Sequence, residues 1–238
     1  MALLDSVRVL GAMARVTATT LVDVVRGDVQ RDRIDDRTHW FGRRVVDLLD
    51  IDLVATGIDR VPTTRAYVYM SNHQSHLDIP VLYATLPSRT IRMLAKKELF
   101  KIPLWGRGLR EAEFIEVDRS NHAAAVQSIA YAAELIEQGI SIYLAPEGTR
   151  SRDGRIAPLK KGGFHLAIDT NTPIVPVAIK GTLDILPRGT RSMRTGQRVE
   201  VTVGAPIPVE GRDLEGLMQE VREFLVERVE GKSGNVGR

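Results

Sequence analysis

The sequence contains no cysteine, which excludes several kinds of chemistry at once. Without a thiol the chain has no disulfide, no thiolate metal site and no cysteine nucleophile. Any covalent intermediate would have to form on another residue.

A long uninterrupted apolar run is also missing. The N-terminal stretch MALLDSVRVLGAMARVTATTLVDVVRG is rich in apolar residues, but Asp5, Arg8, Arg15, Asp23 and Arg26 interrupt it. A membrane-spanning helix or a signal-peptide core needs a longer stretch free of charge. We therefore expect the protein at the cytoplasmic face of a membrane, attached peripherally or monotopically.

Aromatic residues make up only 5% of the chain, whereas basic residues are clustered. Seven basic residues and one acid lie between Arg89 and Arg110, and four basic residues with no acid lie between Arg188 and Arg198. Such clusters attract phosphorylated ligands, nucleic acid or anionic lipid headgroups. Without interleaved aromatic side chains or a groove-reading motif, nucleic acid is the weaker choice, and we expect no nucleic-acid partner.

The length of 238 residues, with no linker or repeat, indicates one domain. Two amphipathic helices are expected at the N-terminus, over Leu3–Val25 and about Arg37–Leu49. Both could simply pack on the core. Trp40 and Phe41, beside two arginines, favour docking on a membrane interface instead.

Beyond residue 50, short β-rich runs alternate with helical stretches, of which Asn121–Gln138 and Asp213–Val229 are the clearest. This alternation predicts an α/β fold: a single domain with a central mixed, partly parallel sheet flanked by helices and preceded by the amphipathic helix pair. Residues 1–50 would be the membrane-docking segment and 51–238 the α/β domain of one structural unit. The expected strands are IDLVAT, AYVYM, IRMLA, FIEV, ISIYLA, PIVPVAI and RVEVTVG.

The most informative segment is SNHQSHLDIP, residues 71–80, directly after an apolar strand. Ser75 with Asp78 matches a helix capping box, whereas Pro80 is compatible only with a first helical turn, so the two signals place the helix start differently. Either way Asp78 lies in the first turn, where the helix dipole favours its ionised form. Near His73 this carboxylate would fix the imidazole tautomer and stabilise the imidazolium. The pattern predicts an acid–base pair whose nucleophile belongs to the substrate; the alternative is a histidine that merely caps a turn.

A second segment, APEGTRSR over residues 145–152, also follows a hydrophobic strand. Gly148 would let the backbone approach a ligand, Thr149 offers a hydroxyl, and the planar guanidinium of Arg150 suits phosphate. A turn with solvated charges is the alternative.

In a third segment, KKELFKIPLWG over residues 96–106, basic and apolar residues are mixed. Lys96 and Lys97 with Leu99 and Phe100 would suit an interfacial surface that holds an anionic amphiphile. An ordinary solvated helix surface is the alternative.

Three other functions compete with the acid–base reading. His73, His76 and Asp78 could bind a metal ion, but no other histidine has ligand spacing, and we expect no metal. Ser75 could be a nucleophile, but the nucleophile-elbow glycines are absent. A catalytically silent module that binds anionic lipid would need His73 and Asp78 only for folding.

Together these segments resemble the glycerolipid acyltransferase family that contains lysophosphatidate acyltransferases. Four blocks match in order, at residues 72–78, 114–119, 146–150 and 174–179, and the resemblance covers about Trp40 to Pro208. The first and third blocks are specific in combination.

The resemblance implies that His73 is the base for the acceptor hydroxyl, with Asp78 as its partner. It further implies that Arg119, Glu147, Gly148 and Arg150 help to hold the acceptor and its phosphate, and that the N-terminal helix pair docks on the bilayer.

The implied reaction moves a fatty acyl group from acyl-CoA or acyl-carrier protein to the sn-2 hydroxyl of 1-acyl-glycerol 3-phosphate, with no acyl-enzyme and no cofactor besides the thioester co-substrate. The expected partners are an anionic membrane surface, a lysophosphatidic-acid-like acceptor and the acyl thioester. Glu113, Glu116 and Ala145 depart from the family's usual residues, so glycerol 3-phosphate, another lysophospholipid and a glycolipid stay open as acceptors.

Overall fold

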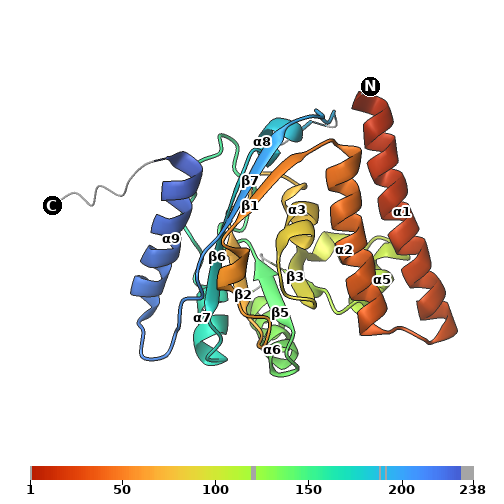
Figure 1. Ribbon diagram of the computed structural model, residues 1–238. Helices are drawn as coiled ribbons and strands as arrows, with labels where there is room; N and C mark the ends of the chain where they lie inside the picture. Colours follow the sequence, from red (N-terminus) through yellow and green to blue (C-terminus); the bar gives the residue numbers. More distant parts are fainter. Residues whose placement is uncertain (1, 119–121, 188, 191, 232–238) are drawn as a thin grey trace.

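The computed structural model describes residues 2–118, 122–187, 189–190 and 192–231, and within them a seven-stranded sheet lies between two layers of helices (Figure 1). The strand order is β1-β7-β6-β2-β5-β3-β4. Neighbouring strands are parallel except β6 and β7, which are antiparallel. The predicted mixed, partly parallel sheet is confirmed, and each expected β-rich run supplies one strand. The strands are β1 (Asp52–Thr56), β2 (Val68–Ser71), β3 (Ile91–Lys96), β4 (Ile115–Val117), β5 (Ser141–Leu144), β6 (Ile174–Lys180) and β7 (Arg198–Val203).

The central strands are apolar on both faces because each face is covered by helices. In β2, Tyr69 joins the core cluster beneath the N-terminal helices, whereas Val68 and Met70 join the cluster on the opposite face. All three are fully buried. A strand buried on both sides reads as a continuous hydrophobic run rather than an alternating one, as AYVYM does.

Helices with a regular apolar stripe begin and end close to the predicted positions. The predicted helix over Asn121–Gln138 is α6, although Asn121 itself lies outside the described residues. In α9 the Asp213 side chain accepts a hydrogen bond from the Gly216 amide at 2.7 Å, a regular N-cap. The helices that follow the N-terminal pair are η1 (Ile58–Arg60), α3 (Asp78–Thr85), α4 (Lys97–Phe100), α5 (Trp105–Glu111), α6 (His122–Glu137), α7 (Gly162–Asp169), α8 (Thr182–Ile185) and α9 (Leu214–Glu230).

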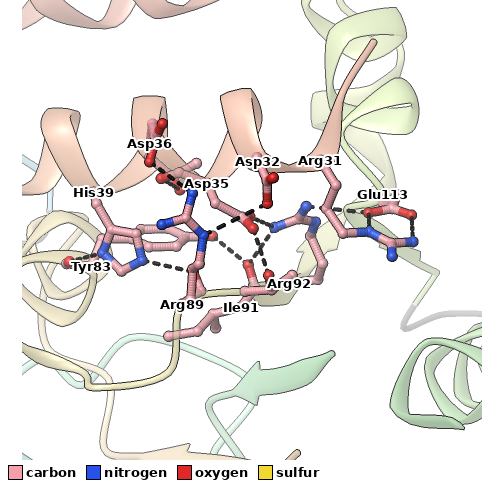
Figure 2. Close-up of polar contacts among 12 residues, drawn as sticks. Arg31, Asp32, Asp35, Asp36, His39, Tyr83, Arg89, Ile91, Arg92 and Glu113 are labelled. Atoms are coloured by element: carbon pink, nitrogen blue, oxygen red, sulfur yellow. Dashed lines mark hydrogen bonds and ion pairs between the residues drawn. The ribbon is translucent and has the colours of Figure 1, made fainter. Parts of the chain in front are cut away.

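The N-terminal pair consists of α1 (Ala2–Arg26) and α2 (Arg31–Leu48), so α2 begins earlier than the predicted Arg37. The first turns of α2 were missed because one inward position there carries Asp35, which is buried, instead of an apolar side chain. Asp35 forms an ion pair with Arg92 of β3 and so joins α2 to the sheet (Figure 2). A charged residue on an inward helix face hides the apolar period on which helix prediction depends.

The helix pair is amphipathic, as predicted. Both acids of α1, Asp5 and Asp23, are buried, and Asp23 pairs with Arg33 and Arg37 of α2. No helix in the described part of the chain combines the length and the apolar content needed to cross a bilayer. Docking of residues 1–50 on a membrane stays a prediction.

The sheet order brings three chain segments together at one edge. Strand β2 lies between β5 and β6 and is parallel to both. The residues that follow these strands therefore emerge at the same edge, the usual position of a site in α/β folds.

Candidate active site

His73 and Asp78 form the predicted pair. His73 Nδ1 lies 2.8 Å from Asp78 Oδ2. A carboxylate oxygen only accepts here, so Nδ1 is the donor, and Nε2 of the neutral ring is left unprotonated. The His73 side chain is 18% exposed and that of Asp78 is fully buried, so the histidine is accessible while its partner is not.

Asp78 is held by donors from three directions. Oδ2 also accepts the backbone N–H groups of Gln74 at 2.7 Å and Ser75 at 3.0 Å, and Oδ1 accepts the hydroxyl of Thr182 at 2.5 Å. Helix α3 begins at Asp78, so Pro80 lies in its first turn and Ser75 lies outside the helix. The bond from the Ser75 amide to Asp78 is half of the predicted capping box. A carboxylate fixed in this way orients the imidazole.

The backbone around His73 is fixed by long-range contacts. Asn72 is fully buried; its side chain donates to the Ile179 carbonyl at 2.7 Å and accepts the Ile179 amide at 2.8 Å. The His73 carbonyl accepts the Ser151 amide at 2.7 Å. These contacts join the segment after β2 to the end of β6 and to the loop after β5.

Glu147 lies in that loop, and its buried carboxylate contacts backbone amides rather than solvent. Its two oxygens accept the N–H groups of His73 and Ala157, each at 2.8 Å. Burial raises the pKa of Glu147, although these two hydrogen bonds act in the opposite direction. These contacts fix the loop against the backbone of His73; contact of Glu147 with an acceptor stays a prediction.

Gly148 has a positive φ of 73°, and a Cβ added there would lie 2.9 Å from Lys160 Cε and 3.0 Å from Lys160 Nζ. The backbone at this glycine thus lies close to the side chain of Lys160; its approach to a ligand stays a prediction. The sequence analysis missed Lys160. The run Lys160-Lys161-Gly162-Gly163 combines basic residues with glycines, a pattern that could have indicated an anion-binding segment.

A cavity of about 280 Å³ opens beside His73. Lys160 and Gly148 line it together with Tyr143 from β5 and Ser128 from α6. A second, mostly apolar cavity of about 190 Å³ lies between the N-terminal helix pair, β3 and α5. Ile79 and Met93 line both cavities, so the two spaces adjoin.

The other predicted binding residues are dispersed. Thr149 is exposed and Arg150 is half-buried at the loop. Lys96 is exposed at the end of β3, whereas Lys97 forms an ion pair of 2.6 Å with Asp118. Arg119 lies outside the described residues.

The structure bears on two of the competing functions, a serine nucleophile and a metal site. Ser75 is fully buried; its hydroxyl donates to the Leu186 carbonyl at 3.0 Å and accepts the Leu77 amide at 3.3 Å, so the group that a nucleophile would need is already engaged. The pKa of His76 is lowered, first by loss of hydration and then by the nearby charge of Arg150. Among the described side chains, no group of three or more His, Asp or Glu is arranged to hold a metal ion. A reaction without a metal stays a prediction.

Comparisons with known proteins show which family the chain resembles. The model of the acyltransferase family matches residues 52–180. A 1-acyl-sn-glycerol-3-phosphate acyltransferase of Limnanthes douglasii is 38% identical over 176 residues, which are 74% of this chain and 60% of that protein. The human 1-acyl-sn-glycerol-3-phosphate acyltransferase alpha is 33% identical over 183 residues, 75% of this chain and 64% of that protein. The chain thus spans less than two thirds of these curated relatives.

A solved structure resembles the whole chain. The crystal structure of the 1-acyl-sn-glycerophosphate acyltransferase PlsC from Thermotoga maritima superposes with a TM-score of 0.83 at 26% sequence identity. The match covers 100% of this chain and 98% of that one. The helix pair is therefore part of the shared fold.

Proposed function

Because the chain belongs to the acyltransferase family, we propose that it transfers a fatty acyl group from acyl-CoA or acyl-carrier protein to the sn-2 hydroxyl of 1-acyl-glycerol 3-phosphate, giving phosphatidic acid. The observation that carries the proposal is the contact of His73 with the fully buried Asp78. This contact leaves His73 Nε2 free to accept a proton, and the nucleophile is then the hydroxyl of the substrate.

The proposed reaction moves one acyl group and one proton. His73 Nε2 takes the proton of the acceptor hydroxyl while that oxygen attacks the thioester carbonyl. The tetrahedral intermediate collapses, the C–S bond breaks, and His73 returns the proton to the departing thiolate. Asp78 stabilises the imidazolium that exists between these steps. No acyl-enzyme forms.

The apolar cavity is the place for a fatty chain. Its lining is apolar apart from Thr17, Thr20, Arg37 and Thr38, and it adjoins the His73 cavity at Ile79 and Met93. A chain lying there would place its carboxyl-derived carbon toward His73. Burial of such a chain contributes about 0.8 kcal/mol for each methylene.

Cations near His73 suit a phosphate. Lys160 lines the same cavity as His73, and the charge of Arg150 reaches His76. Ammonium and guanidinium groups both bind phosphate oxygens. We place the acceptor phosphate among these groups and the helix pair on the anionic, cytoplasmic surface of a membrane.

Thiol release from palmitoyl-CoA tests the reaction in detergent micelles. We expect release to depend on 1-acyl-glycerol 3-phosphate and phosphatidic acid to form, as detected by mass spectrometry. Lysophosphatidylcholine, whose phosphate carries a choline, should react roughly 10- to 100-fold more slowly because charge-assisted contacts worth about 1.5–3 kcal/mol are weakened. Equal release without any acceptor would mean a hydrolase. Faster reaction of glycerol 3-phosphate or a glycolipid would change the acceptor and keep the chemistry.

Replacing Gly108 by leucine tests the apolar cavity. Gly108 lines it, and a Cβ there would meet only Leu21 Cδ2, at 4.0 Å. Leucine would displace roughly three methylene-sized groups of a bound chain, so we expect the rate ratio of lauroyl- to palmitoyl-CoA to rise by roughly tens of fold. Gly108→Ala is the matched control and should keep the wild-type ratio. An unchanged ratio in Gly108→Leu would place the acyl chain elsewhere.

A further inference from the structure

Three exposed apolar side chains lie close together in α4 and in the segment that joins α4 to α5. Leu99, Ile102 and Leu104 are 41%, 47% and 66% exposed. We call these three residues the α4–α5 tip. Isolated exposed apolar residues are ordinary, but three within six positions form a patch, and patches mark contact surfaces.

The backbone of the tip presents Leu104 outward at a conformational cost. Leu104 has φ 64° and ψ −51°, and the Trp105 amide donates to the Pro103 carbonyl at 2.7 Å, which together define a γ-turn. Such a conformation is unfavourable in a residue other than glycine. Exposure of the side chain to water adds nothing favourable, so folding alone does not account for a leucine here.

Neighbouring contacts make the tip rigid. The Gly106 amide donates to the Ile102 carbonyl at 2.8 Å, and the Gly108 amide donates to the Leu104 carbonyl at 2.9 Å. A Cβ added to Gly106 would lie 1.9 Å from the Phe100 carbonyl oxygen, so the chain crosses itself closely at this point. A preformed tip loses little conformational entropy when it binds.

The charges around the tip are complementary to an anionic surface. Lys96, Lys101 and Arg107 are exposed there, against the acids Glu98 and Glu111. Apolar side chains bordered by lysine and arginine are typical of segments that enter an anionic bilayer.

The tip is continuous with α1 and with the apolar cavity. Leu99 and the neighbouring Trp105 line this cavity together with Met13 and Val16 of α1. The exposed face of α1 carries Val7, Leu10, Val22 and Val25, while both of its acids are buried. Leu99 of the tip and Met13 and Val16 of α1 therefore border the same apolar space, and α1 also presents apolar side chains to the outside.

We propose that the α4–α5 tip is a second membrane-inserting element, which enters the hydrocarbon layer of an anionic bilayer beside α1 and opens the apolar cavity to it. The inference rests on the proposed function, since it gives acyl chains a lateral entrance to the same site. A lipid bilayer, not a protein, is the partner.

The test uses the full chain carrying Ile102→Ser and Leu104→Asn. Asparagine adopts positive φ more readily than most residues other than glycine, which makes it the polar replacement best suited to this position. In sedimentation with vesicles of phosphatidylcholine and phosphatidylglycerol, we expect the double variant to bind roughly 10- to 100-fold more weakly than wild type. Val126→Asn, which removes a 55% exposed apolar side chain from α6, is the matched control and should bind as wild type. Equal binding by the double variant would overturn the proposal.

A second measurement reports insertion directly. In a Trp40→Phe background Trp105 is the remaining tryptophan, and lipids brominated in their acyl chains should quench its fluorescence. No quenching in bound protein would also overturn the proposal. Turnover with micellar substrates separates this inference from the function: the double variant should keep wild-type micellar rates, whereas a wild-type chain that inserts but never transfers acyl groups would refute only the proposed reaction.

Discussion

Replacing His73 by alanine is expected to lower kcat for acyl transfer by about 10²- to 10⁴-fold, the usual contribution of a positioned general base. The imidazole is the proposed proton acceptor, and its orientation depends on the 2.8 Å contact with Asp78. Acceptor-dependent thiol release under saturating substrates is the measurement. The side chain is partly exposed, so its removal leaves the core packing intact.

Asp78→Asn separates the charge of the partner from its geometry. The amide oxygen can still accept from His73, Gln74 and Ser75, and the hydroxyl of Thr182 can rotate to accept from the new amide nitrogen. We expect kcat to fall roughly 10- to 100-fold because the imidazolium loses an ionic hydrogen bond worth about 1.5–3 kcal/mol.

His76→Ala is the matched control, since His76 is an exposed histidine of the same segment. It should change kcat by no more than about threefold, as expected of a surface substitution within ~0.5 kcal/mol. If His73→Ala retained robust turnover in a correctly folded protein, the assignment of the base would be wrong.

The second large effect is expected at the buried ion pairs that join the helix pair to the sheet (Figure 2). Arg92 is fully buried; it contacts Asp35 at 2.6 Å and Glu113 at 3.2 Å. Glu113 also accepts from Arg31 of α2 at 2.9 and 2.5 Å. Two elements far apart in the sequence, α2 and the segment between α5 and β4, thus meet at one guanidinium.

Asp35→Ala should destabilise the fold by about 3–5 kcal/mol, because it leaves the buried charge of Arg92 without its closest partner. For a domain of this size that corresponds to a fall in Tm of roughly 6–20 °C by differential scanning calorimetry. The double replacement Asp35→Leu with Arg92→Leu should recover much of the loss, since it removes both buried charges.

Arg89→Ala is the comparison variant. Arg89 pairs with Asp36 across the same interface, but their side chains are 62% and 70% exposed. Exposed pairs contribute about 0–1 kcal/mol. A Tm for Asp35→Ala as high as that of Arg89→Ala would show that the buried pair does not hold the helix pair in place.

The pH dependence of the network follows from Glu113. Burial favours its neutral form, but the hydrogen bond from Arg31 and the charges of Arg92 and Arg31 outweigh it, and the pKa of Glu113 is lowered from its ordinary 4.5. Glu113 therefore contributes its full share to the free energy of unfolding at a pH above its ordinary pKa. This contribution is lost as the pH falls through the lower pKa that Glu113 has in the folded protein. Acid should loosen the junction between the helix pair and the sheet.

Much of the fold was readable from the chain because it depends on local periodicity. The β-branched and apolar runs specified all seven strands, and regular apolar stripes specified α1, α6 and α9. His73 and Asp78 were predictable as a pair because they are five residues apart on one turn after a strand, and their contact needs nothing beyond local geometry.

Tertiary structure decided what surrounds that pair. Thr182 reaches Asp78 from 104 residues away and Ile179 fixes Asn72 across 107, because β6 lies beside β2 in the sheet. Parallel strands next to each other in space are distant in sequence, so strand order determines these contacts and no local pattern records it. The sequence therefore specified the contact between His73 and Asp78, whereas the sheet order placed Glu147 on the backbone of His73 and Lys160 in its cavity.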